Sequence, residues 1–593
     1  MLVEHWILFG TLILTLVLFI TGRWRYDLVA LMALLTLTLA GLIPPERTFS
    51  GFSNPAVITV AAVLVVSRGL QNSGLVDVIG RQLGRLKGGV TIQLAALTGL
   101  ITVLSAFMNN VGALALLLPV TIQLSRKKNL SPSLFLMPIA FASLLGGMTT
   151  LIGTPPNIIV ASFREQTGAE PFGMFDFSPV GVGVALVGVV FITLVGWRMI
   201  PFRNNNASTN GIFDIEKYFT EVRVPEDSKQ AGRSLREFKE LSEAQAVIVG
   251  LVRGKERRMP PQAQTVLEAG DILTVRVDSD NLENLVNTTG LELVGSEEIG
   301  LSNLETDEVN LAEAVVMPNS MLIGGSARSL NLRRNYGVNL LAISRQGARL
   351  RSRLDRVTFQ MGDVLLLQGP ESMLSEILAS LGSLPLAGRG LRIGQPRRIA
   401  LSLIIFMTAL GFAAAGLVPV SVAFMTAVVV MLMAKLLSLR EAYESVDWPI
   451  IILLGAMIPV GEALETSGAA QMIADGLLAI SSQMSPVVTL AVVLVGTMFL
   501  SDLVNNAAAV VLMAPIGISV AEGLNANVDP FLIAVAIGAS CAFLTPIGHQ
   551  SNTLVMGPGS YKFGDYWRMG LPLEVIVVVV AIPLILVAWP LGV

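Results

Sequence analysis

Two long apolar blocks, residues 1–201 and 397–593, restrict the folds open to this chain more than any other feature of its sequence. Each contains runs long enough for helices to cross a bilayer, which takes about 20 residues per helix. The runs lie near 6–21, 27–43, 55–70, 132–160 and 179–200, and near 398–416, 420–438, 449–465, 529–555 and 572–590. Only 14% of the residues are charged, against about 25% in soluble proteins. We therefore expect a polytopic α-helical membrane protein, multi-pass in the cell membrane, with five spans in each block.

The two blocks are copies of one another. The segment LQNSG at 70–74 matches LETSG at 464–468 at an offset of 394 residues, and Asn109 matches Asn505 at 396. Further matches, at offsets of 395 and 389, are Thr150 with Thr545, Gly153 with Gly548, Asn157 with Asn552, Asp176 with Asp565 and Gly181 with Gly570. Matches in the same order with small drifts in offset indicate an internal duplication.

Each block also carries a pair of adjacent asparagines inside an apolar stretch, at 109–110 and at 505–506. From Val111 to the next polar segment is 14 residues, or about 21 Å of helix at 1.5 Å per residue. This is less than the hydrocarbon core of about 30 Å. We therefore expect re-entrant hairpins at 91–124 and 486–516, each turning at its asparagine pair.

The charges around the hairpins predict their orientation. Lys and Arg flank the first hairpin at 81–87 and 126–128, whereas no Lys or Arg flanks the second hairpin. Because positive residues favour the cytoplasmic side, the first hairpin is expected to enter from inside and the second from outside. With five spans in each copy, the blocks are then inverted repeats. The termini are expected outside the cell and the segment 213–385 in the cytoplasm.

The charged segment between the blocks predicts two small soluble α/β modules, at 213–296 and 306–385. Each contains alternating β-branched residues around a short helical stretch. The Gly-Asp pair at 270–271 recurs at 362–363, an offset of 92 residues, and is typical of a turn between strands. Neither module has a G-x-G-x-x-G motif after a strand, so no motif indicates nucleotide binding.

Asparagines at membrane depth are explained if they line a binding site. Irregular backbone survives there only against protein or a watery cavity. Helices that begin at Asn110 and Asn506 present free N–H groups and a positive dipole end to an anion, while carbonyl and amide oxygens suit Na⁺. The alternative is that each pair only caps a kinked helix. Two pairs at matching positions, each followed by a second break with Gly and Asn, favour a site between the repeats.

Other polar residues near the breaks have two interpretations each. Ser105 and Ser501 precede the asparagine pairs by four residues, and either face the same site or bond to a helix carbonyl. Asp502 stands where the first copy has Ala106. As an acid at membrane depth it is a proton or cation group or, as we favour, part of a structural pair. His549, in the second break, is either a site residue or a buried core histidine.

Cysteine and histidine are scarce. Cys541 is the only cysteine, and His5 and His549 are the only histidines, which excludes a disulfide framework and a Cys or His metal centre. No nucleophile–base set indicates an enzyme, and a net charge of −3 without a basic cluster gives no indication of nucleic acid binding. We expect no cofactor beyond sodium as the coupling ion.

At the asparagine pairs and the loops that follow them, the chain resembles the divalent anion/sodium symporter family. The resemblance covers both membrane blocks. The family's hairpin tips carry Ser-Asn-Thr, and a loop similar to Thr-Pro-Pro-Asn follows each. Here the loop at 153–157 matches, whereas the tips have Asn-Asn-Val at 109–111 and Asn-Asn-Ala at 505–507. The resemblance implies sodium ligands at Ser105, Asn110, Gly153, Ser501, Asn506 and Gly548. The resemblance and the position of the second break also give the candidate substrate contacts. These are Asn109, Asn110, Val111, Thr154, Asn505, Asn506, Ala507, His549 and Gln550.

The departures from the family pattern bear on the substrate. Val111 and Ala507 lack the threonine hydroxyls that hold dicarboxylates in the family. His549 and Gln550 stand in place of a Thr-Pro pair and offer further hydrogen-bond donors to an oxyanion. The site is therefore expected to suit a small anion better than a dicarboxylate.

The final segment, 545–573, is similar to the sulfate-permease branch of this family. Members of that branch often carry a cytoplasmic insert of paired modules resembling the carboxy-terminal domain of potassium-uptake regulators. Such modules dimerise and sense small ligands. The resemblance therefore implies a homodimer with an unidentified small ligand for 213–385.

We expect a secondary active transporter that couples Na⁺ entry to the uptake of a small divalent oxyanion, sulfate. An elevator-like movement of the hairpins is what the resemblance implies. The alternatives are a sodium-coupled dicarboxylate symporter and a ligand-gated ion channel with cytoplasmic sensor modules, although the T-V-G-Y-G filter of potassium channels is absent. The sequence does not decide whether H⁺ replaces Na⁺.

Overall fold

The computed structural model describes residues 3–592 apart from several segments. These segments are 22–23, 75–87, 129, 202–218, 229, 242–246, 254–255, 259–263, 277–288, 294–308, 319, 347, 351–353, 387–395 and 482–484. The basic flank at 81–87, used above to orient the first hairpin, lies outside the described residues. The chain divides into two compact units, Met1–Arg203 with Gly388–Val593, and Asn204–Ala387.

The first unit is helical, and eight helical segments in its described part are long and apolar enough to cross a membrane. The first half contains α1 (Val3–Thr21), α2 (Tyr26–Leu39), α3 (Pro55–Asn72), α5 (Val90–Phe107), α6 (Asn110–Lys127), α7 (Ser133–Gly147), α8 (Pro155–Gln166) and α9 (Ser178–Leu194). The second half contains α14 (Pro396–Ala414), α15 (Val420–Met433), α16 (Leu439–Ser445), α17 (Trp448–Thr466), α18 (Ala469–Ser481), α19 (Pro486–Leu503), α20 (Asn506–Gly523), α21 (Val528–Ala539), α22 (Gln550–Met556) and α23 (Tyr566–Ala588). Short 3₁₀ turns lie at Pro45–Arg47, Ser50–Ser53, Gly196–Met199 and Phe563–Asp565.

Several helices begin where the sequence supplies a cap. The Asn54 side chain accepts the Ala56 N–H at 2.8 Å and precedes Pro55 at the first position of α3. The Asn527 side chain accepts the Asp529 N–H at 3.0 Å at the start of α21. A side-chain acceptor satisfies one of the unpaired N–H groups of a helix start, and proline has no N–H to leave unpaired there.

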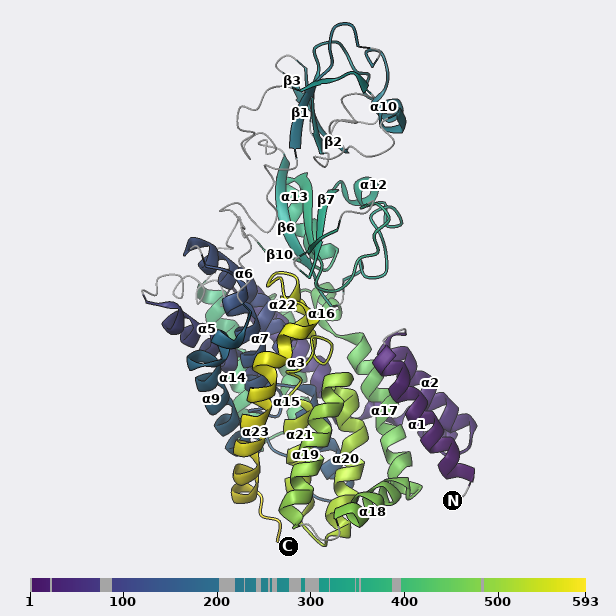
Figure 1. Ribbon diagram of the computed structural model, residues 1–593. Coiled ribbons are helices and arrows are strands. Elements are labelled where there is room, and N and C mark those ends of the chain that lie inside the picture. The colour runs from purple at the N-terminus through teal and green to yellow at the C-terminus, as the bar shows by residue number, and fades with distance from the viewer. Residues whose placement is uncertain are drawn as a thin grey trace. The chain divides into compact units, whose positions relative to one another are not determined.

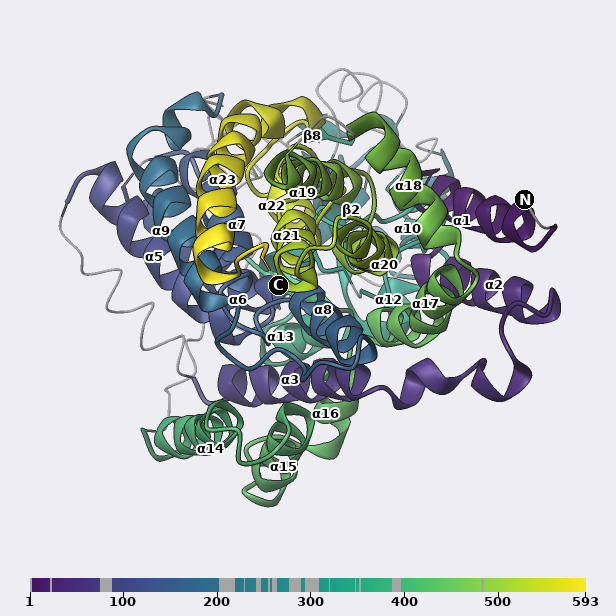
Figure 2. The ribbon, with the colours of Figure 1, turned by 90° about the horizontal axis from the view of Figure 1, so that it is seen from below.

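The two halves pack with the same pattern of neighbours. In the first half α5 packs on α7 and α9, and in the second half α19 packs on α21 and α23 in the same way. Between the halves the contacts are reciprocal, because α2 packs on α17 as α15 packs on α3, and α6 packs on α22 as α20 packs on α8. Figures 1 and 2 show α19, α20, α21 and α23 side by side. Each hairpin therefore meets the second break of the other half.

An ion pair ties the halves together at one of these contacts. The Arg164 guanidinium, near the end of α8, donates to both Asp529 carboxylate oxygens at 2.8 Å each. The same guanidinium lies 4.5 Å from the centre of the Phe172 ring. A bidentate pair with an aromatic ring over the cation fixes the relative position of α8 and α21 more tightly than a single contact does.

The second unit holds two antiparallel sheets with the same strand order. The first contains β1 (Phe219–Arg223), β2 (Val247–Arg253), β3 (Glu256–Arg258), β4 (Ile272–Arg276) and β5 (Glu292–Leu293), in the order β3-β2-β4-β1-β5. The second contains β6 (Val309–Val316), β7 (Asn339–Arg345), β8 (Ala348–Arg349), β9 (Val364–Pro370) and β10 (Ser383–Pro385), in the order β10-β6-β9-β7-β8. Its helices are α10 (Leu235–Leu241), α12 (Leu332–Tyr336) and α13 (Glu371–Ser380).

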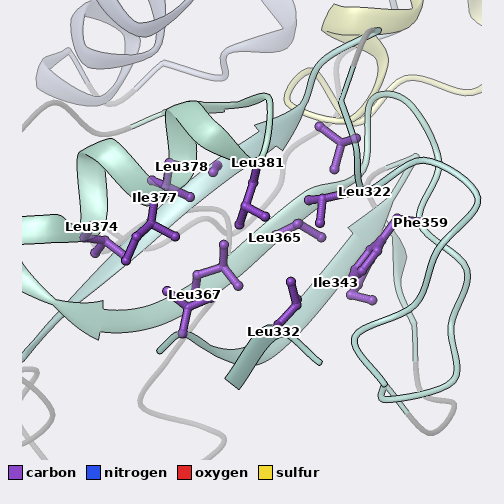
Figure 3. Packing of buried hydrophobic residues seen from close by; sticks show 13 residues of the cluster. Leu322, Leu332, Ile343, Phe359, Leu365, Leu367, Leu374, Ile377, Leu378 and Leu381 are labelled. Carbon is purple, nitrogen blue, oxygen red and sulfur yellow. The ribbon is translucent and has the colours of Figure 1, made fainter. Parts of the chain in front are cut away.

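Each of the two sheets also contains an Arg–Asp ion pair at the equivalent position. Arg253 at the end of β2 donates to both oxygens of Asp271 at 2.8 Å, and Arg345 at the end of β7 contacts Asp363 at 2.7 and 2.8 Å. These aspartates follow the glycines of the repeated Gly-Asp pairs, which have φ of 88° and 80°. Leu365 and Leu367 of β9 face the leucines of α13 across the core of the second sheet (Figure 3).

Candidate functional site

The first asparagine of each pair caps the second helix of its hairpin. Two residues separate α5 from α6, and two separate α19 from α20. The Asn109 side chain accepts the Val111 N–H at 3.0 Å, and the Asn505 side chain accepts the Ala507 N–H at 2.9 Å. Capping therefore accounts for Asn109 and Asn505, and leaves the second asparagine of each pair to be explained.

The second asparagine of the first pair is buried against the end of α7. Asn110 is 2% exposed, and its amide oxygen accepts a hydrogen bond from the Ser105 hydroxyl at 2.6 Å. A Cβ on Gly147 would lie 2.4 Å from this oxygen, so any side chain at this position would displace the Asn110 amide. The second copy differs, because the Ser501 hydroxyl donates to the Ala539 carbonyl of α21 at 2.5 Å. Ser501 thus has its partner on a neighbouring helix and not on its own helix.

Two glycines let the second break of each half approach its hairpin or the preceding helix. A Cβ on Gly153 would lie 2.3 Å from the Gly147 carbonyl oxygen. A Cβ on Gly548 would lie 2.8 Å from the Ser501 carbonyl oxygen. Real Cβ atoms do not approach an oxygen this closely, so both positions require glycine. The first loop therefore lies against the end of α7, and the second lies against α19.

Threonine and asparagine side chains fasten each second break. Thr150 donates to the Ala106 carbonyl of α5, and Thr545 donates to the equivalent carbonyl of α19 at 2.8 Å. The Asn157 amide then donates to the Thr150 carbonyl at 2.8 Å, and the Asn552 amide to the Thr545 carbonyl at 3.1 Å. The amide oxygens of both asparagines are buried without a donor among the described residues. The sequence marked these positions only as repeat matches; their recurrence was the available signal.

The hairpin tips and second breaks of both halves line one small cavity of about 30 Å³. Its lining residues are Asn109, Asn110, Val111, Pro155, Pro156, Ile450, Asn505, Asn506, Ala507, His549 and Gln550. Every residue predicted to contact the substrate lines this cavity except Thr154. Ile450, from α17, joins the lining although no motif marks it.

The remaining predicted residues lie beside the cavity lining. Thr154 is 1% exposed, and its hydroxyl has no partner among the described residues. Of the residues expected to bind sodium, Asn110 and Asn506 line the cavity. The others, Ser105, Gly153, Ser501 and Gly548, are not part of that lining.

His549 and Gln550 begin the helix of the second break in the carboxy-terminal half. The His549 Nδ1 accepts the Ser551 N–H at 3.0 Å and caps α22. With Nδ1 as acceptor, the neutral ring carries its proton on Nε2 and is a donor there. The Gln550 side chain lies near Tyr26 at the start of α2. Tyr26 is a further contact that the sequence did not indicate.

Membrane-length helices in two matching halves, with broken helices that meet around one cavity lined by four asparagines, define a multi-pass membrane transporter. The sequence pattern of the citrate transporter family matches residues 16–538 and 482–592. The chain therefore belongs to the citrate transporter family. It is similar to an uncharacterized transporter of Synechocystis sp., with 31% identity over 576 residues, which cover 96% of this chain and 94% of the relative.

Several relatives from Chlamydomonas reinhardtii carry names that mention sulfur or sulfate. A putative sulfur deprivation response regulator is 27% identical over 585 residues, which cover 95% of this chain and 98% of the relative. Sodium/sulfate cotransporter 2 is 28% identical over 359 residues, which cover 57% of this chain and 40% of the cotransporter.

Proposed function

We propose that this protein is a sodium-coupled symporter that takes up a small divalent oxyanion, sulfate. The observation that carries the proposal is the cavity between the two hairpin tips, to which each half contributes an asparagine pair. The names of the sodium/sulfate cotransporters among its relatives support the same substrate and coupling ion.

Several groups at the cavity suit an oxyanion. Helices α6 and α20 both begin at its lining, and a helix start offers unpaired N–H groups and a partial positive charge. The Nε2–H of His549 and the amide of Gln550 provide further donors. No Lys or Arg is among the lining residues, so a buried dianion needs a charge partner from solution. A bound Na⁺ supplies that charge, which links anion binding to the cation.

The size of the cavity favours a compact anion. A cavity of about 10–15 Å³ by this measure holds one water molecule, so about 30 Å³ leaves room for roughly two. Any divalent anion requires the tips to separate. A tetrahedral ion requires less separation than a four-carbon dicarboxylate with a carboxylate at each end.

We assign the sodium ions to the oxygens behind the cavity. In the first half these are the Ser105 hydroxyl, the Asn110 amide oxygen and carbonyls near Gly153. In the second half they are carbonyls near Gly548 and the Asn506 amide oxygen, while the Ser501 hydroxyl takes part only if it leaves Ala539. Neutral oxygens of this kind bind Na⁺ in broken-helix transporters.

The arrangement in the membrane belongs to the same proposal. The two halves are inverted repeats, each with a re-entrant hairpin, and transport proceeds by an elevator-like movement of the hairpins and breaks. The segment 213–385 lies in the cytoplasm, regulates transport in response to a small ligand, and supports a homodimer. The reciprocal contacts between the halves support the repeat, and the two sheets of identical strand order support paired modules.

Uptake into proteoliposomes tests the proposal. Labelled sulfate, succinate and citrate are offered separately to the purified protein, with and without an inward Na⁺ gradient. Saturable, gradient-dependent uptake of sulfate is expected, with succinate and citrate as weaker competitors. Preferred uptake of succinate or citrate would overturn the substrate assignment, and uptake of sulfate independent of Na⁺ would overturn the coupling.

A further inference from the structure

A second and larger cavity of the helical unit lies at the end of α15. Its volume is about 630 Å³, within the range of about 300–1,000 Å³ that is typical of ligand pockets. The cavity lies where α3, α14, α15 and α16 meet, and Figure 2 shows these four helices next to one another. Half of its lining residues are leucine or methionine, and the other half are polar or charged. None of them lines the anion cavity between the hairpin tips.

The wall of this cavity contains two cations and one carboxylate. Both oxygens of the Glu441 carboxylate are already bonded, since Oε1 accepts the Asn72 amide at 2.9 Å and Oε2 accepts the Ser438 N–H and hydroxyl at 2.8 Å each. The side chains of Arg398 and Lys435 are exposed and have no hydrogen-bond or ion-pair partner in the part of the chain that the structure describes. With two positive charges against one negative charge, the wall has a net charge of +1 and two cations open to a ligand.

Lys435 has a backbone conformation that disfavours lysine. It follows the end of α15 with φ of 54°, in the left-handed region. Its N–H donates to the Leu432 carbonyl at 3.0 Å. The next N–H, of Leu436, donates to the Met431 carbonyl at 3.0 Å. This pattern ends a helix most often at glycine, because a Cβ is strained in the left-handed region. A strained residue that is retained beside a cavity indicates a function.

The first half has the usual residue at the equivalent position. Helices α2 and α15 both have 14 residues, and the offset of 394 places Gly41 opposite Lys435. Gly41 has φ of 79°, and its N–H donates to the Thr38 carbonyl at 3.0 Å, so the two turns are alike. The same offset places Glu4 opposite Arg398. The first half thus has an acid and a glycine where the second half has two cations, so the turn itself does not require them.

The apolar part of the wall continues along α15. Met433 is 79% exposed and Leu439 is 64% exposed, and Val429 and Val430 are exposed one turn earlier on the same helix. Cations at the end of an apolar helix, with exposed apolar side chains beside them, match the two parts of a phospholipid. The charged headgroup meets the cations, and the acyl chains cover the apolar side chains.

We propose that this cavity binds the headgroup of an anionic phospholipid, with Lys435 and Arg398 on its phosphate and its acyl chains along Met433 and α15. A lipid with one negative charge matches the net charge of the wall. A soluble phosphate would meet the cations but leave the apolar side chains uncovered. The lipid contacts α3 of the first half and α14, α15 and α16 of the second half, so its binding stabilises the packing between the halves.

Native mass spectrometry of the purified full-length protein measures this binding. Phosphatidylglycerol and phosphatidylcholine with identical acyl chains are titrated into the delipidated protein in neutral detergent. One phosphatidylglycerol per chain is expected to bind more tightly than phosphatidylcholine. Lys435→Gly and Arg398→Gln should each weaken its binding about fivefold, the contribution of one cation next to an anionic lipid. Arg440→Gln removes an exposed cation of α16 that pairs with Glu444 outside the lining, and as the matched control it should keep the affinity.

Thermal unfolding distinguishes a lipid site from a structural helix end. Without added lipid, Lys435→Gly should unfold at the same temperature as the wild type or a higher one, since glycine suits the left-handed position. Phosphatidylglycerol should then stabilise it less than the wild type. Lys435→Asn, which this position also tolerates, should behave in the same way.

Three results would overturn the lipid site. The first is unchanged phosphatidylglycerol binding in Lys435→Gly and Lys435→Asn. The second is equal binding of phosphatidylglycerol and phosphatidylcholine by the wild type. The third is displacement of phosphatidylglycerol by an equal concentration of glycerol 3-phosphate, which would show a site for a soluble phosphate.

Discussion

Replacing Asn110 by alanine separates a sodium ligand from a structural cap. Asn110 is the buried asparagine whose amide oxygen accepts from the Ser105 hydroxyl at 2.6 Å. Its neighbour Asn109 already caps α6, so Asn110→Ala leaves the cap in place. The substitution removes an oxygen from the candidate sodium site and leaves the Ser105 hydroxyl without its acceptor.

The two consequences have different magnitudes. A buried hydroxyl without a partner costs about 1–3 kcal/mol of unfolding free energy. Because Ser105 lies in a helix, its hydroxyl can turn to the carbonyl one turn earlier, so a loss of about 1 kcal/mol is expected. A lost contact to a charged ion costs about 1.5–3 kcal/mol of binding free energy. That corresponds to an increase of about 10- to 150-fold in the Na⁺ concentration needed for half-maximal uptake.

A double-mutant cycle distinguishes the effects. In Ser105→Ala/Asn110→Ala no hydroxyl is left without a partner, so the thermal stability in detergent should recover relative to Asn110→Ala. The Na⁺ dependence of sulfate uptake should stay weakened in both variants. Asn527→Ser, which keeps a capping oxygen at the start of α21 and lies outside the cavity lining, is the control and should retain a nearly normal Na⁺ dependence. If Asn110→Ala lowers the melting temperature but leaves the Na⁺ dependence unchanged, Asn110 is only structural.

Three further predictions test the wider arrangement. Single cysteines at Ser228 and Asn525, on a cysteine-free background, should react with impermeant reagents from inside and outside respectively; reaction from the same side contradicts inverted repeats. Gly153→Ala places a methyl group 2.3 Å from a backbone carbonyl oxygen of α7, so a loss of about 1–3 kcal/mol of stability is expected. Thermal unfolding measures it, and an unchanged melting temperature contradicts the close contact. Joining residues 202 and 396 by a flexible linker should leave Na⁺-driven uptake at an altered rate. A folded deletion that binds the anion without transporting it contradicts a purely regulatory insert.

The duplication made the candidate cavity predictable. A single Asn-Asn pair has two equal explanations, but recurrence at an offset of 396 residues pointed to a pair of matched helix breaks. The structure has those breaks, with helices that begin at Asn110 and Asn506. The residues that recur are those at the helix breaks, because an interrupted helix needs particular residues where one helix ends and the next begins.

Contacts that depend on distant helices were not predictable. Ile450 and Tyr26 reach the cavity region from α17 and α2, and an isoleucine or tyrosine in an apolar run carries no signal of its own. Ser501 shows the same limit in another way. It occupies the position of Ser105, yet its hydroxyl donates to a carbonyl of α21. Sequence position predicts where a hydroxyl lies, whereas the neighbouring helix determines its partner.

Asp502 is a further residue whose surroundings depend on helices distant in the sequence. It had no counterpart in the first half and no evident partner, since Glu574 lies 72 residues further along in an apolar run. Packing of α19 on α23 brings the two acids together. The duplication supplies the frame for both halves, and the replacement of Ala106 and Ala185 by acids makes the halves chemically different. The loop between α21 and α22 is therefore held by the Asp502 carboxylate, which accepts the Leu544 N–H at 2.9 Å, whereas Ala106 at the equivalent position of the first half offers no side-chain acceptor.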